Sequence, residues 1–464
     1  MPKAIWWIRR DLRLADNPAL CAAFALGTVI PVFIRDPHLL ERTPARRQAF
    51  LFAGLRALEA GLRARGGHLT VRTGEAGETL SGLMAETGAE TVWAEEDYTP
   101  YARARDEKVA RTFPLRLTAG QTVHPPQSVL KADRSPYTVF TPYSRAWKAM
   151  LPPRITLLPA PARLDSSAYP SEELPDPAPY RQALFPASEA EARRRLDAFL
   201  DKRISAYGEA RNRMDLDGTS SLSPYIRFGM ISLRQAASGA LEVMRQASNS
   251  AAEKSAETWL NELIWREFYV AILYHFPAVL RASFRPDLRS IAWAADPSGL
   301  EAWKMGQTGY PVVDAAMRQL LQTGWMHNRA RMITASFLVK DLLVDWRLGE
   351  RWFMQNLLDG DPAANNGGWQ WTAGTGTDAA PYFRVFNPIL QGQKFDPLGE
   401  AVRRWLPELA NVPVQYIHTP WTMPVELQTH LGCVIGRDYP APIIQHDSAR
   451  QRILHVYGAA SRKG

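Results

Sequence analysis

The stretch Asp359-Gly-Asp-Pro-Ala-Ala-Asn-Asn-Gly-Gly-Trp-Gln-Trp371 is the segment around which we expect the rest of the chain to be organised. It combines acids, amides, paired glycines and tryptophans with almost no aliphatic side chains. Paired glycines let a backbone approach a flat ligand closely, Asn365 and Asn366 offer amide donors and acceptors, and Trp369 and Trp371 bring large π surfaces. This composition favours a cofactor-binding loop. The alternative is an ordinary turn that ends on two packing tryptophans, because turns use the same residue types.

The length and composition of the chain indicate a globular protein of two domains. Its 464 residues exceed what one hydrophobic core usually organises. The 55 Lys and Arg outnumber the 47 Asp and Glu, and the net charge of +8 suits an anionic partner such as nucleic acid. The 15 tryptophans are more than an average core needs, so they require a further explanation.

Cysteine usage and hydropathy point to a reducing compartment. Only Cys21 and Cys433 occur, which excludes a disulfide framework and a thiolate zinc site. No apolar run reaches membrane-spanning length, and the residues after Met1 lack the pattern of a secretory signal. We therefore expect a cytoplasmic protein that does not contact a membrane.

The first part of the chain, residues 1–130, is predicted to be an α/β domain built on a doubly wound parallel sheet, because short apolar runs alternate with helical patterns. The predicted strands are Ile5–Ile8, Thr28–Ile34, His68–Val71, Glu90–Trp93 and Leu115–Leu117, and the predicted helices include Arg47–Leu62 and Glu75–Thr87.

The loops of this sheet do not carry an ordinary dinucleotide fingerprint. Arg9-Arg-Asp-Leu-Arg-Leu-Ala-Asp-Asn17 stands where Gly-x-Gly-x-x-Gly would follow the first strand. Glu95-Glu-Asp-Tyr-Thr-Pro-Tyr101 lies just past the carboxyl end of a strand, where open sheets bind ligands. A solvated acidic loop is the favoured explanation of that second segment.

Residues 131–187 are predicted to be a long linker, because prolines crowd in Leu151-Pro-Pro-Arg154 and Leu174-Pro-Asp-Pro-Ala-Pro179. Helical patterning begins at the capping box Ser188-Glu-Ala-Glu191 and continues almost to the end. Residues 188–464 are therefore predicted to form an all-α domain.

Hydroxyl groups cluster in Gly218-Thr-Ser-Ser-Leu-Ser-Pro-Tyr-Ile-Arg227. Ser223 is expected to cap a helix that begins at Pro224, with Thr219, Ser220 and Ser221 just ahead of its positive end. A phosphate or pyrophosphate could be held there. A plain N-cap is the alternative.

The segment Trp259–Leu273 is predicted to be a helix with two different faces. One face mixes two indoles and a phenol with one acid and one Arg, as the wall of a ligand cavity would, whereas a solvated face carries Lys and Glu. The alternative is a helix buried on both sides with an internal ion pair. The apolar face comprises Leu260, Leu263, Ile264, Phe268 and Ala271, and the mixed face comprises Trp259, Glu262, Trp265, Arg266 and Tyr269.

Gly309–Gly324 is predicted to be a structural helix framed by Pro and Gly. In the following Trp325–Met332, Arg331 could pair with Asp359 or Asp361. With nine His and no His/Cys cluster, no metal site is expected. The segments Pro381-Tyr-Phe-Arg384 and Gln391-Gly-Gln-Lys394 suit contacts with a nucleic-acid backbone.

Three regions, residues 259–269, 309–343 and 359–388, resemble the photolyase/cryptochrome family. The likeness extends to Trp6–Pro18 and Thr219–Ser223, and so covers nearly the whole chain. The resemblance implies an N-terminal α/β antenna domain and a C-terminal helical domain that holds FAD in a U shape. It also implies light-driven electron transfer from reduced FAD to a cyclobutane pyrimidine dimer flipped out of UV-damaged DNA.

The resemblance also implies a role for individual residues. Glu262 matches the acid that hydrogen-bonds the dimer, Trp265 and Trp371 the indoles that hold it, Met332 the methionine beside it, and Asn365 the amide at flavin N5. The tryptophans that match an electron relay from the surface to the flavin are Trp369, Trp346 and Trp293. Further matches to DNA contacts are Asn328, Arg329, Arg384 and Gln391. Matches to cofactor contacts are Tyr207, Thr219, Ser220, Ser221, Leu222, Ser223, Trp259, Arg266, Asn328, Arg331, Asp359, Asp361 and Asn365, with an expected Arg331–Asp359 pair.

Within the family the chain is most similar to class I cyclobutane-dimer photolyases, and we expect it to act as a monomer. The resemblance implies that enzymes repairing (6-4) photoproducts carry two adjacent histidines in their site. Here His327 is followed by Asn328, and Met332 stands where another His would be expected. Blue-light cryptochromes, the main alternative, often replace the amide at flavin N5. A second antenna chromophore, such as a folate, a deazaflavin or FMN, is possible, with Glu95 and Glu96 near where a folate-binding acid would lie.

Overall fold

The computed structural model describes residues 2–164, 168–176, 184–381 and 383–461. The chain divides into two compact units. Unit 1 comprises Met1–Gly208 and Ser220–Pro277, and unit 2 comprises Glu209–Thr219 and Ala278–Gly464.

Unit 1 contains the predicted parallel sheet. Its strands are β1 (Lys3–Ile8), β2 (Thr28–Arg35), β3 (Thr70–Thr73), β4 (Thr91–Glu95) and β5 (Leu115–Thr118). They are ordered β3-β2-β1-β4-β5 and all pair in parallel. The five predicted strands are confirmed, although β3 begins two residues later than predicted. β1 and β2 are continuous buried apolar runs, as parallel strands commonly are.

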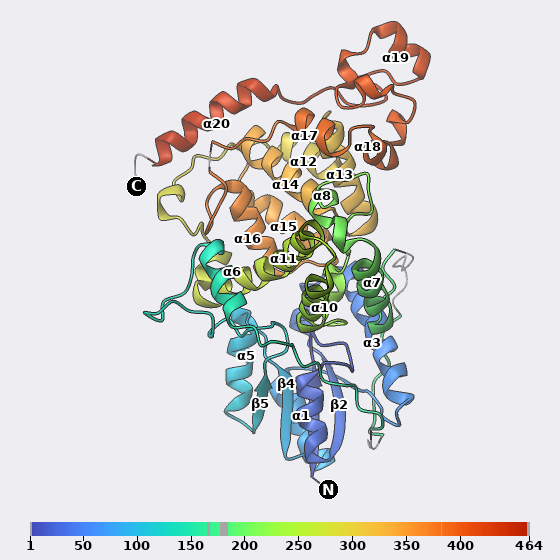
Figure 1. Cartoon of the computed structure of the whole chain (residues 1–464), viewed down its shortest axis with the longest axis vertical. Coiled ribbons are helices and arrows are strands. Elements are labelled where there is room, and N and C mark those ends of the chain that lie inside the picture. Colours follow the sequence, from blue (N-terminus) through green and yellow to red (C-terminus); the bar gives the residue numbers. More distant parts are fainter. Residues whose placement is uncertain (1, 165–167, 177–183, 382, 462–464) are drawn as a thin grey trace. The chain divides into compact units, whose positions relative to one another are not determined.

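Helices cover both faces of this sheet, as the doubly wound prediction requires. The helices that alternate with these strands in the chain are α1 (Pro18–Leu26), α2 (Pro37–Glu41), α3 (Ala45–Arg63), α4 (Ala76–Thr87) and α5 (Pro100–Ala110). Residues of α4 and α5 share a core with Ile5, Trp7 and Val32 on one face. Figure 1 shows α1 lying over the strands on the other.

The acidic segment after β4 is not a solvated loop, so that expectation is wrong. Glu95, Asp97 and Tyr98 are buried. The reason is the cationic segment after β1, whose guanidinium groups neutralise these acids. Arg13 pairs with Glu95, Arg10 with Asp97 at 3.5 Å, and Arg9 with Asp106 at 2.6 Å.

The other helices of unit 1 lie later in the chain. They are α6 (Phe140–Ala149), α7 (Glu189–Lys202), η1 (Ile204–Ala206), α8 (Tyr207–Ala210, which passes into unit 2), α9 (Ser223–Arg227), α10 (Leu233–Gln246) and α11 (Ser250–His275). The predicted linker thus contains a helix, α6, whose Tyr143, Ser144 and Trp147 are buried. Residues 165–167 and 177–183 of that linker lie outside the described residues. The predicted domain boundaries stay a prediction, and the compact units divide the chain differently.

Ser188 caps α7 by accepting a hydrogen bond from the backbone N–H of Glu191 at 3.1 Å, as predicted. The Glu191 carboxylate binds Arg194 and Arg195, both at 2.7 Å. Glu191, the acid of the predicted capping box, therefore stabilises the following turn of α7 through these ion pairs.

Unit 2 is helical, as predicted for this part of the chain. Its elements are η2 (Pro277–Leu280), η3 (Pro286–Leu288), α12 (Pro297–Met305), α13 (Pro311–Thr323), α14 (Asn328–Ser336), the π-helical turn η4 (Phe337–Asp341), α15 (Trp346–Asn356), α16 (Pro362–Ala373), α17 (Pro388–Phe395), α18 (Glu400–Trp405), η5 (Pro407–Leu409), η6 (Val414–Tyr416), η7 (Pro420–Thr422), α19 (Val425–Leu431) and α20 (His446–Ser461).

One large core organises unit 2. It joins residues of α12 to α16, among them Trp303, Trp346 and Trp369. In Figure 1, α12, α13 and α14 lie together near α17 and α18. Across the described residues, none of the helices combines the length and the apolar character needed to cross a bilayer.

Candidate functional site

The segment predicted to be a cofactor loop is largely a helix, α16, so both the loop and the turn explanations are wrong about its backbone. Asp361 caps the helix by accepting hydrogen bonds from the N–H groups of Ala363 at 3.0 Å and Ala364 at 3.2 Å. Pro362 begins the helix, and Gly374 ends it with φ 77°. An acidic N-cap followed by proline is a strong helix start, and it outweighs the cost of two interior glycines.

One face of α16 is buried and the other is partly open. Asn366, Trp369 and Gln370 are buried, whereas Asn365, Gly368 and Trp371 are half-buried. A Cβ atom added to Gly368 would meet nothing within 4 Å. The half-buried face thus places an amide, a bare stretch of backbone and an indole in succession, which is a surface suited to a flat ligand.

The orientation of the Asn365 amide is set by α15. Its Nδ2 donates to the backbone oxygen of Glu350 at 3.1 Å. The other amide atom, Oδ1, is therefore left as a hydrogen-bond acceptor. An acceptor that carries no proton is what a ligand N–H at this face would require.

A buried polar network behind Asn365 was not predicted from the sequence. Asn366 Nδ2 donates to Glu350 Oε1 and to the oxygen of Val279, both at 3.0 Å, and Gln370 Nε2 donates to Asn366 Oδ1 at 3.0 Å. Burial raises the pKa of Glu350 to about 7. These amides satisfy one another, so Asn366 has a structural role.

The expected Arg331–Asp359 pair is confirmed. It is bidentate, with Nη2–Oδ2 at 2.8 Å and Nη1–Oδ1 at 3.2 Å. Arg331 Nε also donates to the oxygen of Met326 at 2.9 Å. Asp361, the other partner considered for this Arg, instead caps α16.

The start of α14 carries two more of the predicted residues. His327 Nδ1 accepts from the N–H of Arg329 at 3.1 Å, and burial together with Arg329 and Arg331 lowers the pKa of His327 to about 4, so this side chain is neutral. Asn328 Nδ2 lies 3.9 Å from Met332 Sδ, which places these two side chains together.

Arg329, predicted to contact DNA, binds within unit 2. Its Nη2 and Nε donate to Asn212 Oδ1 at 2.7 and 3.2 Å, and its guanidinium lies 4.5 Å from the centre of the Phe395 ring. Arg384 is exposed and Gln391 is half-buried on α17, while Tyr382 lies outside the described residues. Their DNA contacts stay a prediction.

The three predicted relay tryptophans belong to one cluster of unit 2. Trp346 and Trp369 are buried and Trp293 is partly buried against them. Trp369 packs edge-on against Phe353 at 5.0 Å and Trp303 at 6.0 Å. Gly349 makes room for it, because a Cβ there would lie 2.1 Å from the indole. This gradation from buried to partly buried suits a path towards the surface.

In unit 1, the prediction for α11 holds for its apolar face. Leu260, Leu263, Ile264, Phe268 and Ala271 are all buried. On the mixed face, Glu262, Trp265, Arg266 and Tyr269 are half-buried. Trp259 is buried and packs against Phe199 with ring centres 4.9 Å apart, so its contact with a cofactor stays a prediction.

The structure corrects the expected helix cap at Ser223. α9 begins at Ser223 itself, with Leu222 at the N-cap and no side-chain cap bond. Ser221 has φ 50°, so the chain turns sharply before the helix. Tyr207 is buried against Phe199, and phosphate binding by Thr219, Ser220, Ser221 and Ser223 stays a prediction.

Glu267 is a further residue that the sequence reasoning missed. It is buried on the apolar side of α11, where it accepts from Trp147 Nε1 at 2.6 Å, the N–H of His124 at 3.3 Å and the N–H of Val123. Burial raises the pKa of Glu267 to about 7. Its position beside Phe268 in the apolar pattern was the available signal.

Comparison with known proteins gives consistent matches along the chain. A family model described as "DNA photolyase" matches residues 4–162, and one described as "FAD binding domain of DNA photolyase" matches residues 259–459. The chain is 42% identical to a "Deoxyribodipyrimidine photo-lyase" of Salmonella typhimurium, with 100% of each chain covered, and 41% identical to one of Escherichia coli, with 99% of this chain and 98% of the relative covered.

Solved structures match equally broadly. A bacterial class III photolyase from Agrobacterium tumefaciens has a TM-score of 0.92 and 37% identity, with 100% of this chain and 98% of that chain covered. A cryptochrome from Synechocystis has a TM-score of 0.88 and 29% identity, with 98% and 99% covered. An archaeal photolyase from Sulfolobus tokodaii, described with two FAD molecules, has a TM-score of 0.84 and 31% identity, with 98% and 100% covered.

Proposed function

Because the chain belongs to the DNA photolyase family, we propose that it is a deoxyribodipyrimidine photo-lyase that uses light to split cyclobutane pyrimidine dimers in DNA. The observation that carries this proposal is the half-buried face of α16. There Asn365 is held with its amide oxygen as an acceptor, beside the open backbone of Gly368. Assignment to class I within the family is part of the proposal.

The residues of α16 and its surroundings fit FAD. Asn365 Oδ1 would accept from the N–H of a reduced isoalloxazine ring, and because an amide carries no acidic proton it would stabilise that ring without protonating it. The Arg331–Asp359 ion pair and the capping bonds of Asp361 fix the positions of these charged side chains. The further proposed contacts with the cofactor are the hydroxyls of Thr219, Ser220, Ser221 and Ser223, together with Tyr207, Leu222, Trp259, Arg266 and Asn328. When bound, reduced FAD would absorb light and supply the electron that splits the dimer.

The lesion would be held by aromatic and polar side chains. We propose that Glu262 hydrogen-bonds the dimer, that Trp265 and Trp371 pack against its two bases, and that Met332 lies beside it. Half-buried indoles can bury a flipped base on their free surface, and stacking contributes about 1–3 kcal/mol for each base.

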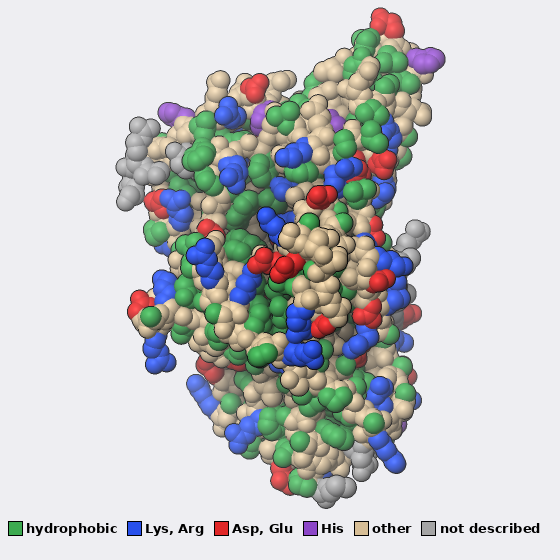
Figure 2. Space-filling model, in the orientation of Figure 1, with side chains coloured by type: hydrophobic (Ala, Val, Ile, Leu, Met, Phe, Trp, Pro, Cys, Tyr) green, Lys and Arg blue, Asp and Glu red, His purple; other side chains and the backbone are tan. Residues whose placement is uncertain are grey.

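The proposed substrate is UV-damaged duplex DNA, and the proposed contacts with its backbone are Asn328, Arg329, Arg384 and Gln391. The chain carries a net charge of +8. On the face drawn in Figure 2, Lys and Arg side chains are spread among acidic ones, so no single basic patch carries this excess there. Contacts of Lys and Arg side chains with phosphates would make DNA binding weaken as the salt concentration rises.

We also propose that the protein acts as a monomer in the cytoplasm. Both cysteines, Cys21 and Cys433, are free, which suits a reducing compartment. A second antenna chromophore in unit 1 is compatible with the family, and we assign it no chemistry. Glu95, considered as a folate-binding acid, is buried in its pair with Arg13.

The proposal is tested by repair of an oligonucleotide that contains one thymine dimer, under blue light, with the purified and photoreduced protein. Loss of the dimer with light and its persistence in the dark are expected. A protein that binds FAD and is photoreduced but leaves every dimer intact would be a sensor of the cryptochrome type. Equal binding of irradiated and unirradiated DNA would instead indicate a flavoprotein that does not act on lesions.

A further inference from the structure

We propose that α6 is a brace that fixes the orientation of Trp265, and that Phe140 is a positioning residue for the lesion. The inference rests on the proposed function, because it gives Trp265 the lesion as its partner. It assigns a role to a helix inside the region that the sequence predicts to be a linker. All the residues that carry it belong to unit 1.

The central observation is the contact between Phe140 and Trp265. Their ring centres are 3.8 Å apart and the ring planes differ by 4°. Aromatic pairs usually prefer an offset or edge-on arrangement with centres about 4.5–7 Å apart. A nearly parallel pair at shorter distance therefore needs other contacts that hold its two helices in place.

Those other contacts lie along one face of α6. Ser144 Oγ donates to Asn261 Oδ1 at 3.3 Å, and Trp147 Nε1 donates to Glu267 Oε2 at 2.6 Å. Phe140, Ser144 and Trp147 follow one another at spacings of one helical turn, so they point the same way.

Two further contacts join α6 to α11. Lys148 forms an ion pair with Glu257 at 2.6 Å, and Tyr143 packs on Phe268 with ring centres 5.2 Å apart. The partners on α11 run from Glu257 to Phe268 and so flank Trp265 on both sides in the sequence. α6 is therefore attached to α11 on each side of the indole that it stacks upon.

Two further aromatic neighbours of Trp265 come from its own helix. Phe268 lies 5.6 Å away and nearly perpendicular, and Tyr269 lies 5.5 Å away and tilted by 38°. Residues on α11 move together with Trp265, so they cannot by themselves set its plane against a second element. Phe140 provides that reference and covers one face of the indole. Trp265 stays half-buried, which leaves surface for a base.

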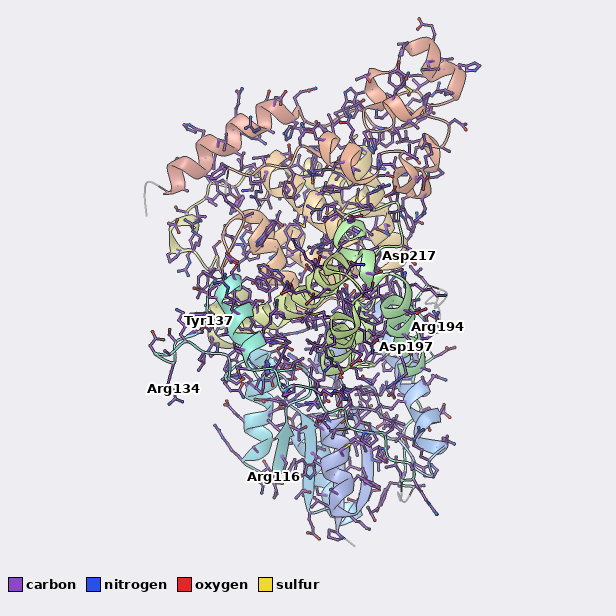
Figure 3. The ribbon with its side chains drawn as sticks, in the orientation of Figure 1. Arg116, Arg134, Tyr137, Arg194, Asp197 and Asp217 are labelled. Atoms are coloured by element: carbon purple, nitrogen blue, oxygen red, sulfur yellow. The ribbon has the colours of Figure 1, made fainter. Side chains whose placement is uncertain are left out.

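The first turn of α6 contacts the segment of chain just before it. Val139 is the N-cap, and it makes no side-chain cap bond. In the segment before it, Leu130 and Pro136 form a bridge, and Tyr137 packs edge-on against Tyr143 at 6.3 Å. Figure 3 shows Arg134 projecting from the loop while Tyr137 lies near α6. The chain is thus folded back on α6 just before Phe140.

The test uses Phe140→Leu in the full-length protein, with binding to duplex DNA that contains one thymine dimer compared with the same undamaged duplex. We expect the preference for damaged DNA to fall by about 3- to 10-fold, the loss expected for one aromatic pair, with little change for undamaged DNA. Phe140→Tyr keeps a ring in this position and should restore the preference. Phe113→Leu removes another half-buried aromatic ring of unit 1 and should leave the preference unchanged.

An unchanged preference in Phe140→Leu would overturn the proposal, as would a loss that Phe140→Tyr does not restore. If Phe140→Leu fails to fold, Ser144→Ala decides, because it loosens the brace without removing the ring. It should lower the preference in the same direction, by less, and an unchanged preference would overturn the brace. Failure of the proposed function is a different result, since the unaltered protein would then bind damaged and undamaged DNA equally.

Discussion

Asn365 and Glu350 form a linked pair, because the backbone oxygen of Glu350 orients the amide of Asn365 while its carboxyl oxygen binds Asn366. The first contact decides which atom Asn365 can offer to a ligand. The second contact places an ionisable group, the Glu350 carboxyl of α15, against the buried face of α16. Titration of Glu350 should therefore affect the folded state directly.

We predict that Glu350 makes the stability of the protein depend on pH. Burial raises the pKa of Glu350 from 4.5 to about 7, so the protonated form favours the folded state. That contribution is fully present below about pH 4.5 and is lost as the pH rises through about 7. Between pH 5 and 7.5 the unfolding free energy of the unaltered protein should fall by about 1–3 kcal/mol more than that of Glu350→Gln.

Denaturant unfolding at several pH values measures this difference. Glutamine keeps the acceptor for Asn366 but does not titrate. Glu301→Gln, on the exposed surface of α12, is the matched control and should follow the unaltered protein. Parallel curves for Glu350→Gln and the unaltered protein would contradict the prediction.

Glu262 is predicted to act on the lesion and not on the cofactor. Glu262→Ala should lower the repair yield per absorbed photon by about 2- to 10-fold, as expected for one lost hydrogen bond, while FAD stays bound. Repair assays together with the flavin absorbance of the purified variant measure both effects. Purification of this variant without FAD would show that Glu262 belongs to the cofactor site.

At the scale of the helix, α16 contains a glycine whose cost the fold does not explain. Gly368 has helical neighbours and open space at its Cβ position. A glycine inside a helix costs about 0.5–1 kcal/mol relative to alanine. The proposed function gives the reason, because a Cβ would project into the face that receives the flavin.

We therefore predict that Gly368→Ala stabilises the apoprotein but lowers the amount of FAD that the purified protein carries. The gain should be about 0.5–1 kcal/mol in unfolding free energy. Gly82→Ala on α4 is the matched control, because Gly82 also has nothing within 4 Å of its Cβ position and lies on an exposed helix face. It should give a similar gain in stability with unchanged FAD content. Equal FAD content in both variants would place the flavin away from Gly368.

The tryptophan cluster joins α15, α16 and the segment before α12, and its proposed role can be separated from repair. Trp369→Phe should block light-driven reduction of oxidised flavin, because phenylalanine is much harder to oxidise than tryptophan. Enzyme that is already reduced should still repair dimers. Flavin absorbance under illumination and single-turnover repair measure the two steps. Rapid photoreduction in the variant would mean that the electron route does not pass through Trp369.

For the whole molecule, the net charge predicts how DNA binding responds to salt. If Lys and Arg neutralise several phosphates, the logarithm of the binding constant falls linearly with the logarithm of salt concentration, by about 0.9 for each phosphate contacted. Replacing Arg384, which is exposed on unit 2, by Ala should reduce this slope by about one. Filter binding between low and moderate salt measures it. An unchanged slope would remove Arg384 from the DNA interface.

Much of the fold followed from local patterns. The five strands were predicted because buried parallel strands are continuous apolar runs, and α13 because proline begins it and Gly324 ends it with φ 71°. The Arg331–Asp359 pair was also predicted. This prediction was possible because both residues already belonged to the set assigned to the cofactor site, and their charges are opposite.

Two of the errors, at Glu95 and Glu267, share a physical cause. Glu95 reads as a solvated acid until Arg13 is placed beside it, and Glu267 reads as a minor interruption of an apolar face until Trp147 binds it. In both cases the partner is far along the chain, so no local pattern reports the burial. The error at α16 has a different cause, because the Asp361 cap and Pro362 are local signals that outweigh the two glycines inside the helix.

The sequence by itself determined the parallel sheet, the helical character of the remainder and the family, because periodicity and short motifs are local properties. Tertiary structure alone decided which acids are buried, which atom Asn365 offers, and which ring lies against Trp265. Those outcomes depend on partners brought together by packing, and packing couples residues whose separation along the chain carries no signal.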